Sequence, residues 1–115
     1  MTCMILVIMR MKVVSKKRWE LSQAIVSLTG SIRTKKGCRS CDICQSLQNE
    51  NELCLIEEWD TPEDFRAHLK SEHFKVLRGA MNLLEEPCEG TSYDVLHSEA
   101  MVENGRIVSV EKVSQ

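Results

Sequence analysis

Three of the six cysteines in this chain stand three residues apart, in the segment GCRSCDICQS at residues 37–46. Thiolates at this spacing bind zinc or an iron–sulfur cluster when the segment forms a loop. A bacterial iron–sulfur motif needs a fourth cysteine followed by proline, but Gln48 and Asn49 occupy those positions. A zinc ribbon needs a second CxxC pair, but Cys54 and Cys88 are single. We therefore expect no metal here.

The backbone conformation of this segment decides what its thiols can do. If residues 38–47 form a strand, side chains three residues apart point to opposite faces and lie roughly 10 Å apart. Cys41 then cannot share a binding site with Cys38 or Cys44. We expect the three cysteines to be small strand residues, partly buried in the sheet. Thiol redox chemistry at Cys38, Cys41 and Cys44 is the alternative, and a metal site would require a loop.

The residues before this segment predict a strand and then a helix. Residues 3–14 begin as a continuous apolar run and become strictly alternating, which is typical of a strand. Ser15 is expected to cap a helix over residues 16–31. Four apolar residues of that helix are spaced by four, three and four, as one buried stripe requires. They are Leu21, Ile25, Leu28 and Ile32.

The residues after this segment predict a second strand, a helical region and a last strand. Residues 38–47 and 53–59 are separated by a polar turn and indicate a hairpin. Thr61 is expected to cap a helix that has Pro62 at its first position. Ser71 is a second cap, and the apolar stripe behind it ends before Pro87. Residues 91–97 form the last predicted strand.

The β-α-β-β-α-β order predicts an α+β, ferredoxin-like fold, with a four-stranded antiparallel sheet and helices on one face. One domain is expected over residues 1–97, followed by a tail at 98–115 with a weak strand pattern at 106–110. The second face of the sheet would carry Met4, Leu6 and Ile8. Such an apolar surface needs a cover, so we expect a homodimer formed through the sheet.

Composition excludes several classes of partner. The chain has 115 residues, 43% of them hydrophobic and 28% charged, as in folded domains. Its formal net charge of −2 gives no attraction to nucleic acid or to an anionic membrane. The apolar run at residues 4–9 is too short to span a bilayer and follows no positive residue. We therefore expect a cytoplasmic protein with reduced thiols.

Several motifs together resemble the antibiotic biosynthesis monooxygenase family. In that family a glycine-cysteine pair opens the second strand, here Gly37 and Cys38. The third strand ends in glutamate, any residue and tryptophan, here Glu57 and Trp59. A histidine-leucine pair, at residues 68–69, and a serine-capped helix, at residues 71–74, follow. The resemblance covers most of residues 4–97 and implies a dimeric α+β barrel with a pocket between each sheet and its own helices.

The resemblance also implies an activity, the oxygenation of a quinol-like or polyphenolic small molecule without any cofactor. No flavin or metal is needed, because a deprotonated phenol that is shielded from water can itself reduce oxygen. His68 is the expected catalytic base, since it shares a helix face with Phe65 and Leu69 and would point toward the sheet. The expected pocket residues are Trp59, Phe65, Leu69, Phe74 and Leu77.

Departures from the family pattern keep other functions open. Haem-degrading members use a strand-one asparagine and a haem-ligating histidine, but the first strand has no asparagine and Arg78 stands at the histidine position. Cys41 and Cys44 stand where oxygenases often carry aromatic residues. The alternatives are a non-catalytic dimer that binds a small ligand or responds to stress, and a thiol-redox sensor that uses Cys38, Cys41 and Cys44.

Overall fold

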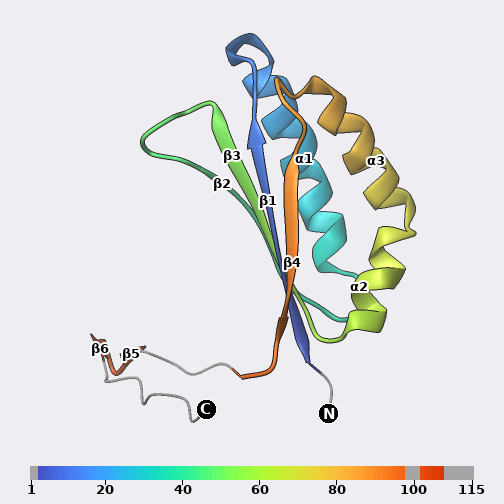
Figure 1. Cartoon of the computed structure of the whole chain (residues 1–115), viewed down its shortest axis with the longest axis vertical. Helices are drawn as coiled ribbons and strands as arrows, with labels where there is room; N and C mark the ends of the chain where they lie inside the picture. Colours follow the sequence, from blue (N-terminus) through green and yellow to red (C-terminus); the bar gives the residue numbers. More distant parts are fainter. Residues whose placement is uncertain (1–2, 98–101, 108–115) are drawn as a thin grey trace.

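The computed structural model of the protein describes residues 3–97 and 102–107. Four antiparallel strands form one sheet in the order β2-β3-β1-β4, and the helices cover one of its faces (Figure 1). This is the predicted ferredoxin-like α+β fold, in which two short helices follow the third strand. The elements of the domain are β1 (Met4–Lys12), a 3-10 turn (Ser15–Lys17), α1 (Arg18–Arg33), β2 (Cys38–Gln45), β3 (Glu52–Trp59), α2 (Pro62–Leu69), α3 (Glu72–Ala80), a 3-10 turn (Met81–Leu83) and β4 (Glu89–Val95).

The core lies between the sheet and the helices. Strands β1 and β3 are the two central strands, and every second residue of β3 is buried against the helical layer. The four-residue stripe predicted for α1 is confirmed, because Leu21, Ile25, Leu28 and Ile32 are all buried. The buried residues of the strands therefore pack against the buried stripe of α1 in one apolar layer. This packing fixes the register of β3.

Two of the three predicted helix caps are confirmed. Thr61 and Ser71 accept hydrogen bonds from the backbone N–H groups of Asp64 and Phe74, at 3.1 and 3.2 Å. The prediction for Ser15 is wrong, because α1 begins three residues later. The Ser15 hydroxyl instead accepts a hydrogen bond of 2.9 Å from Asn51 Nδ2 in the β2–β3 turn. This contact joins segments that are far apart in sequence, so local propensity does not indicate it.

Strand β2 contains a bulge that changes which cysteines share a face. Cys38 pairs with Trp59 and Ser40 pairs with Glu58, so the ladder shifts by one residue between them. Beyond the shift, Cys41 lies opposite Glu57 and faces the helices, on the same side as Cys38. The prediction that residues three apart point to opposite faces is therefore wrong for Cys38 and Cys41, because the bulge takes up one residue. It is correct for Cys41 and Cys44.

The turn before β2 requires a glycine. Gly37 has a φ of +83°, and a β-carbon there would overlap the Asp64 carboxyl group. We expect Gly37→Ala to lower the free energy of unfolding by about 1–2 kcal/mol, the usual penalty for this backbone conformation. Gly79 lies in α3 with open space around it. The same change there is expected to raise stability by about 0.5–1 kcal/mol. Urea unfolding measures both, and equal effects would contradict the assignment of strain to Gly37.

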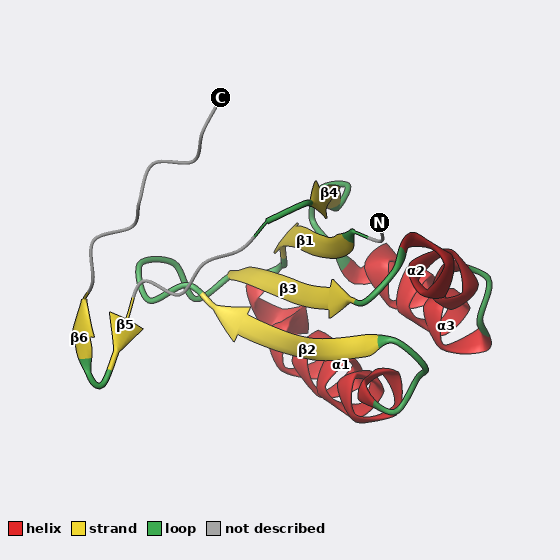
Figure 2. Ribbon diagram, turned by 90° about the horizontal axis from the view of Figure 1, so that it is seen from below, coloured by secondary structure: helices red, strands yellow, loops and turns green. Residues whose placement is uncertain are grey.

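The face of the sheet away from the helices is partly apolar, as predicted. Met4, Leu6 and Ile8 point to this face, and the strand partners of Ile8 include Ile56 on β3. Tyr93 on β4 belongs to the same face and is 48% exposed. Figure 2 shows this side of the sheet without a helical cover. We call these residues, Met4, Leu6, Ile8, Ile56 and Tyr93, the outer apolar patch.

The chain beyond β4 contributes a short ladder of its own. Strands β5 (Val102–Glu103) and β6 (Arg106–Ile107) pair with each other in an antiparallel two-stranded sheet. The strand predicted at residues 106–110 begins with β6, and its remaining positions lie outside the described residues. In the described part of the chain, no helix is both long and apolar enough to cross a membrane.

Candidate functional site

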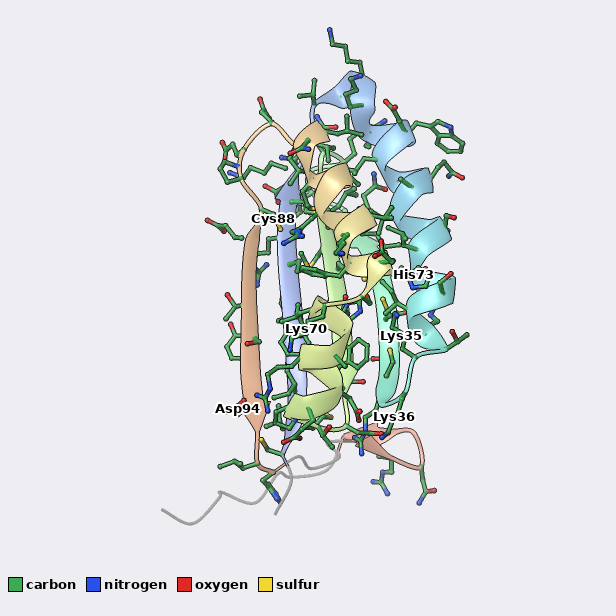
Figure 3. All side chains as sticks on the ribbon, turned by 90° about the vertical axis from the view of Figure 1, so that its right-hand side faces the viewer. Lys35, Lys36, Lys70, His73, Cys88 and Asp94 are labelled. Atoms are coloured by element: carbon green, nitrogen blue, oxygen red, sulfur yellow. The ribbon has the colours of Figure 1, made fainter. Side chains whose placement is uncertain are left out.

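A cavity of about 270 Å³ lies between the sheet and the two short helices. Figure 3 shows α2 and α3 in front of the sheet, with α1 on one side and β4 on the other. The wall is mainly apolar, and it includes a single carboxylate. Its lining residues are Val7, Met9, Glu57, Phe65, Leu69, Phe74, Gly90, Thr91 and Ser92. An apolar cavity with few polar groups is the usual form of a small-molecule site.

Glu57 is the ionisable group that faces this cavity. Alternation in β3 places it on the inner face between Leu55 and Trp59, where a carboxylate is unusual, and it is only 2% exposed. The indole Nε1 of Trp59 donates a hydrogen bond of 2.8 Å to Glu57 Oε1, which fixes the carboxylate. Burial raises the pKa of Glu57, and the Trp59 hydrogen bond opposes the shift. A raised pKa makes this carboxylate a stronger base once it is ionised.

His68 lies directly beside this carboxylate. Its ring stacks on Trp59, with 4.7 Å between the ring centroids and 23° between the planes. It also meets the Phe74 ring edge-on, with 5.5 Å between the ring centroids. The residue is 2% exposed, and His68 Nε2 lies 3.7 Å from Glu57 Oε1, which is beyond hydrogen-bond range. Neither ring nitrogen has a hydrogen-bond partner. Buried polar atoms are nearly always paired, so this histidine needs an explanation.

The protonation state of His68 follows from its surroundings. Burial lowers the pKa of His68 to about 4, and the positive groups Lys35 and His73 contribute in the same direction. Lys35 lies in the turn after α1 and His73 in the first turn of α3 (Figure 3). The imidazole is therefore neutral near pH 7, with one nitrogen able to accept a proton and the other able to donate one.

Comparison with known protein families identifies the family of this chain. The family model for antibiotic biosynthesis monooxygenases matches residues 4–80, about two thirds of the chain. The chain belongs to the antibiotic biosynthesis monooxygenase family. No curated protein gives a significant match to it.

Solved structures support the fold of this family member. A conserved protein from Methanosarcina mazei is 25% identical, with a TM-score of 0.77, and the match covers 82% of this chain and 94% of that one. A protein from Mycobacterium tuberculosis is 26% identical, with a TM-score of 0.78 and coverage of 84% and 99%. A Nitrosomonas europaea protein with a provisional antibiotic biosynthesis monooxygenase assignment is 23% identical, with a TM-score of 0.78 and coverage of 87% and 97%.

The cavity between the sheet and the two short helices contains part of the site that was expected from the sequence. Phe65, Leu69 and Phe74 line it. Trp59 and Leu77 are 0% and 1% exposed and belong to the core beneath it. His68 is adjacent to the cavity through Glu57 and does not itself line it. Sequence reasoning placed Glu57 in the family motif without a role, although an acid at an inward position of an alternating strand is a usable signal.

The remaining cavity wall comes from elements that sequence reasoning did not connect with the site. Val7 and Met9 belong to the inner face of β1, and residues 90–92 of β4 pair directly with that strand. These residues of β1 and β4 come together only because the two strands are neighbours in the sheet. A pattern of residues along the chain does not show this contact.

The three thiols singled out in β2 have different environments. Cys41 is 0% exposed, and burial together with the nearby Glu57 raises its pKa to about 12. Burial also raises the pKa of Cys38, which packs against the core. Cys44 is exposed on the opposite face. Within residues 3–97 and 102–107, no three cysteine, histidine or acidic side chains are grouped to hold a metal ion.

Proposed function

We propose that this protein is a cofactor-independent monooxygenase that acts on a quinol-like or polyphenolic small molecule. The observation that carries the proposal is the buried Glu57 carboxylate at the wall of an apolar cavity, with the neutral His68 imidazole beside it. Family membership supports the reaction class, because the matched family is named for monooxygenases. Glu57 supplies what such a reaction requires from the protein, namely a proton acceptor beside an apolar binding surface.

The proposed reaction begins with removal of a proton from a ring hydroxyl. The Glu57 carboxylate accepts this proton, since it is the ionisable carboxyl group at the cavity wall and its pKa is raised. The Trp59 indole holds the carboxylate in place, and the neutral His68 imidazole lies 3.7 Å from it. The electron-rich phenolate then reduces oxygen directly. One oxygen atom enters the ring and the second leaves as water, together with hydrogen from the substrate.

The cavity indicates the size and polarity of the substrate. Its volume of about 270 Å³ lies just below the usual range of ligand pockets, which is about 300–1,000 Å³. Two phenyl rings and the Met9 thioether offer contacts to an aromatic face. The Ser92 residue on the inner face of β4 adds a hydroxyl group near one edge. A molecule of one or two rings with free hydroxyl groups fits this description.

Oxygen uptake with a panel of quinols tests the proposal, and a cavity-filling variant provides the comparison. Gly90 lines the cavity opposite Met9, and a β-carbon there meets Met9 Cγ at an ordinary 3.6 Å. We expect Gly90→Leu to fold and to lose oxygen uptake to near the rate without protein. Gly79→Leu, which adds the same side chain to the exposed part of α3, should keep the wild-type rate. If ligands stabilise the protein thermally but no oxygen is consumed, the protein is a binder and the proposal fails.

We also propose that the protein is a homodimer formed through the outer apolar patch. Leu6, Ile8 and Ile56 are only half-buried on this face, and a second copy of the same surface would remove them from water. Placing a charge within the patch with Ile56→Asp should give a monomer. Analytical ultracentrifugation of this variant and the wild type measures the change, and a monomeric wild type would contradict the proposal.

A further inference from the structure

Beside the β2–β3 hairpin lies a second hollow, of about 440 Å³, which shares no residue with the candidate site. Cys44 of β2, Cys54 of β3 and Arg10 of β1 are among its lining residues. The three residues lie in one row across the sheet, since Cys44 pairs with Cys54 and Cys54 pairs with Arg10. Their side chains therefore share the face away from the helices.

The ladder register brings the two thiols within reach of each other. Ser46 N donates a hydrogen bond of 3.0 Å to Glu52 O, which marks these residues as a hydrogen-bonded pair. Pairs two positions along an antiparallel ladder have the same phase, so Cys44 and Cys54 also form a hydrogen-bonded pair. Opposite residues of this kind have Cα atoms about 5.5 Å apart. Disulfides join Cα atoms about 4.4–6.8 Å apart, so the expected Cα separation of this pair lies within the range that a disulfide spans.

The two thiols differ in access to solvent. Cys44 is exposed, Cys54 is partly buried, and both are free thiols. Burial raises the pKa of Cys54, while the Arg10 guanidinium opposes that shift. Cys44 is thus the accessible sulfur, and Cys54 is the neighbour beneath it. This arrangement of an exposed thiol beside a resolving thiol is typical of redox-sensitive cysteines.

We propose that Cys44 and Cys54 are a dithiol that is oxidised to a cross-strand disulfide by a small-molecule disulfide. The Cys44 thiolate attacks one sulfur of that molecule, which forms a mixed disulfide and releases one small thiol. The Cys54 thiolate then attacks the Cys44 sulfur, forms the Cys44–Cys54 bond and releases the second small thiol. Two electrons and two protons pass from the cysteine pair to the two released thiols.

The position of the pair keeps it accessible in the proposed dimer. Cys44 and Cys54 lie in the row of Arg10 and Glu89, next to the salt bridge between Lys12 and Glu86 at 3.7 Å. This charged row lies outside the outer apolar patch. A polar margin of this kind stays in contact with solvent when an apolar surface is covered. The disulfide would join the strands beside their hairpin, away from the cavity that faces the helices.

Incubation of the reduced full-length protein with oxidised glutathione tests this proposal. The expected product is a single chain, not linked covalently to another, that is about 2 Da lighter than the reduced chain and carries no glutathione. Cleavage after Glu50 and Glu52 separates the two cysteines in sequence, so a disulfide keeps the two peptides joined until a reductant is added. Cys44→Ser and Cys54→Ser should each abolish the joined peptides. The matched Cys41→Ser variant, which changes a buried thiol of the same strand, should retain them.

Three results would overturn the proposal, and none of them depends on the oxygenase activity. A stable mixed disulfide at Cys44 that never resolves would show that Cys54 cannot reach it. A link that contains Cys3, Cys38, Cys41 or Cys88 would assign the chemistry to another pair. A bond between the Cys44 residues of two copies would make the modification intermolecular. In every case the oxidised and reduced chains are compared by mass alone.

Discussion

Replacing Glu57 with glutamine is expected to lower kcat for oxygen uptake about 100-fold or more, because the proposed proton acceptor is lost. Glutamine has nearly the same volume, and its amide oxygen can still accept the hydrogen bond that Trp59 donates. The cavity and the fold should therefore be preserved. KM should change little, since the amide keeps the polar contact to a substrate hydroxyl but cannot take its proton at neutral pH.

The next residue of the same strand provides the control. Glu58 points to the opposite face of the sheet, where the Ser40 hydroxyl donates a hydrogen bond of 2.7 Å to it. Glu58→Gln makes the same chemical change outside the cavity and should keep the wild-type kcat. Stopped-flow or electrode measurements of oxygen uptake compare the two variants. A Glu57→Gln protein with the wild-type rate would remove this carboxylate from the mechanism.

Features set by neighbouring residues could be predicted from the sequence. The Thr61 and Ser71 caps depend on a side chain and a backbone N–H group three residues later, so both appear in the local sequence. The buried stripe of α1 depends on helical periodicity alone. The inward direction of His68 follows from the apolar residues on its helix face, and its burial confirms that direction. These local rules were enough to give the element order and the fold class.

Features that depend on pairing between distant segments could not be predicted in this way. The bulge in β2 appears only when Cys38 and Ser40 are matched to their partners on β3, so the sequence placed Cys38 on the wrong face relative to Cys41. Ser15 satisfies both the pattern of a cap and the contact with Asn51, and tertiary packing selects the second. The hydrogen bond from Trp59 to Glu57 likewise requires both side chains on the inner face. The site was therefore harder to predict than the fold.

The stability of the protein is expected to depend on pH through His68. Its pKa is about 4 in the folded protein and 6.5 when unperturbed. Between about pH 6.5 and pH 4, His68 therefore binds a proton in the unfolded chain but not in the folded chain. Acidification thus favours unfolding. Each unit of pKa difference corresponds to about 1.4 kcal/mol, so this histidine removes about 3 kcal/mol of stability between about pH 7 and pH 4. Glu57 acts in the opposite direction, because its raised pKa means that the folded chain binds this proton at a higher pH than the unfolded chain does.

The contribution of His68 is isolated by comparing the wild type with His68→Phe. Phenylalanine keeps an aromatic ring against Trp59 but cannot titrate. Urea unfolding at several pH values should show the wild type losing about 3 kcal/mol more than this variant as the pH falls from about 7 to 4. If the wild type and His68→Phe lose stability in parallel, the folded protein accepts a proton on His68 without cost, and the imidazole is not held neutral beside Glu57.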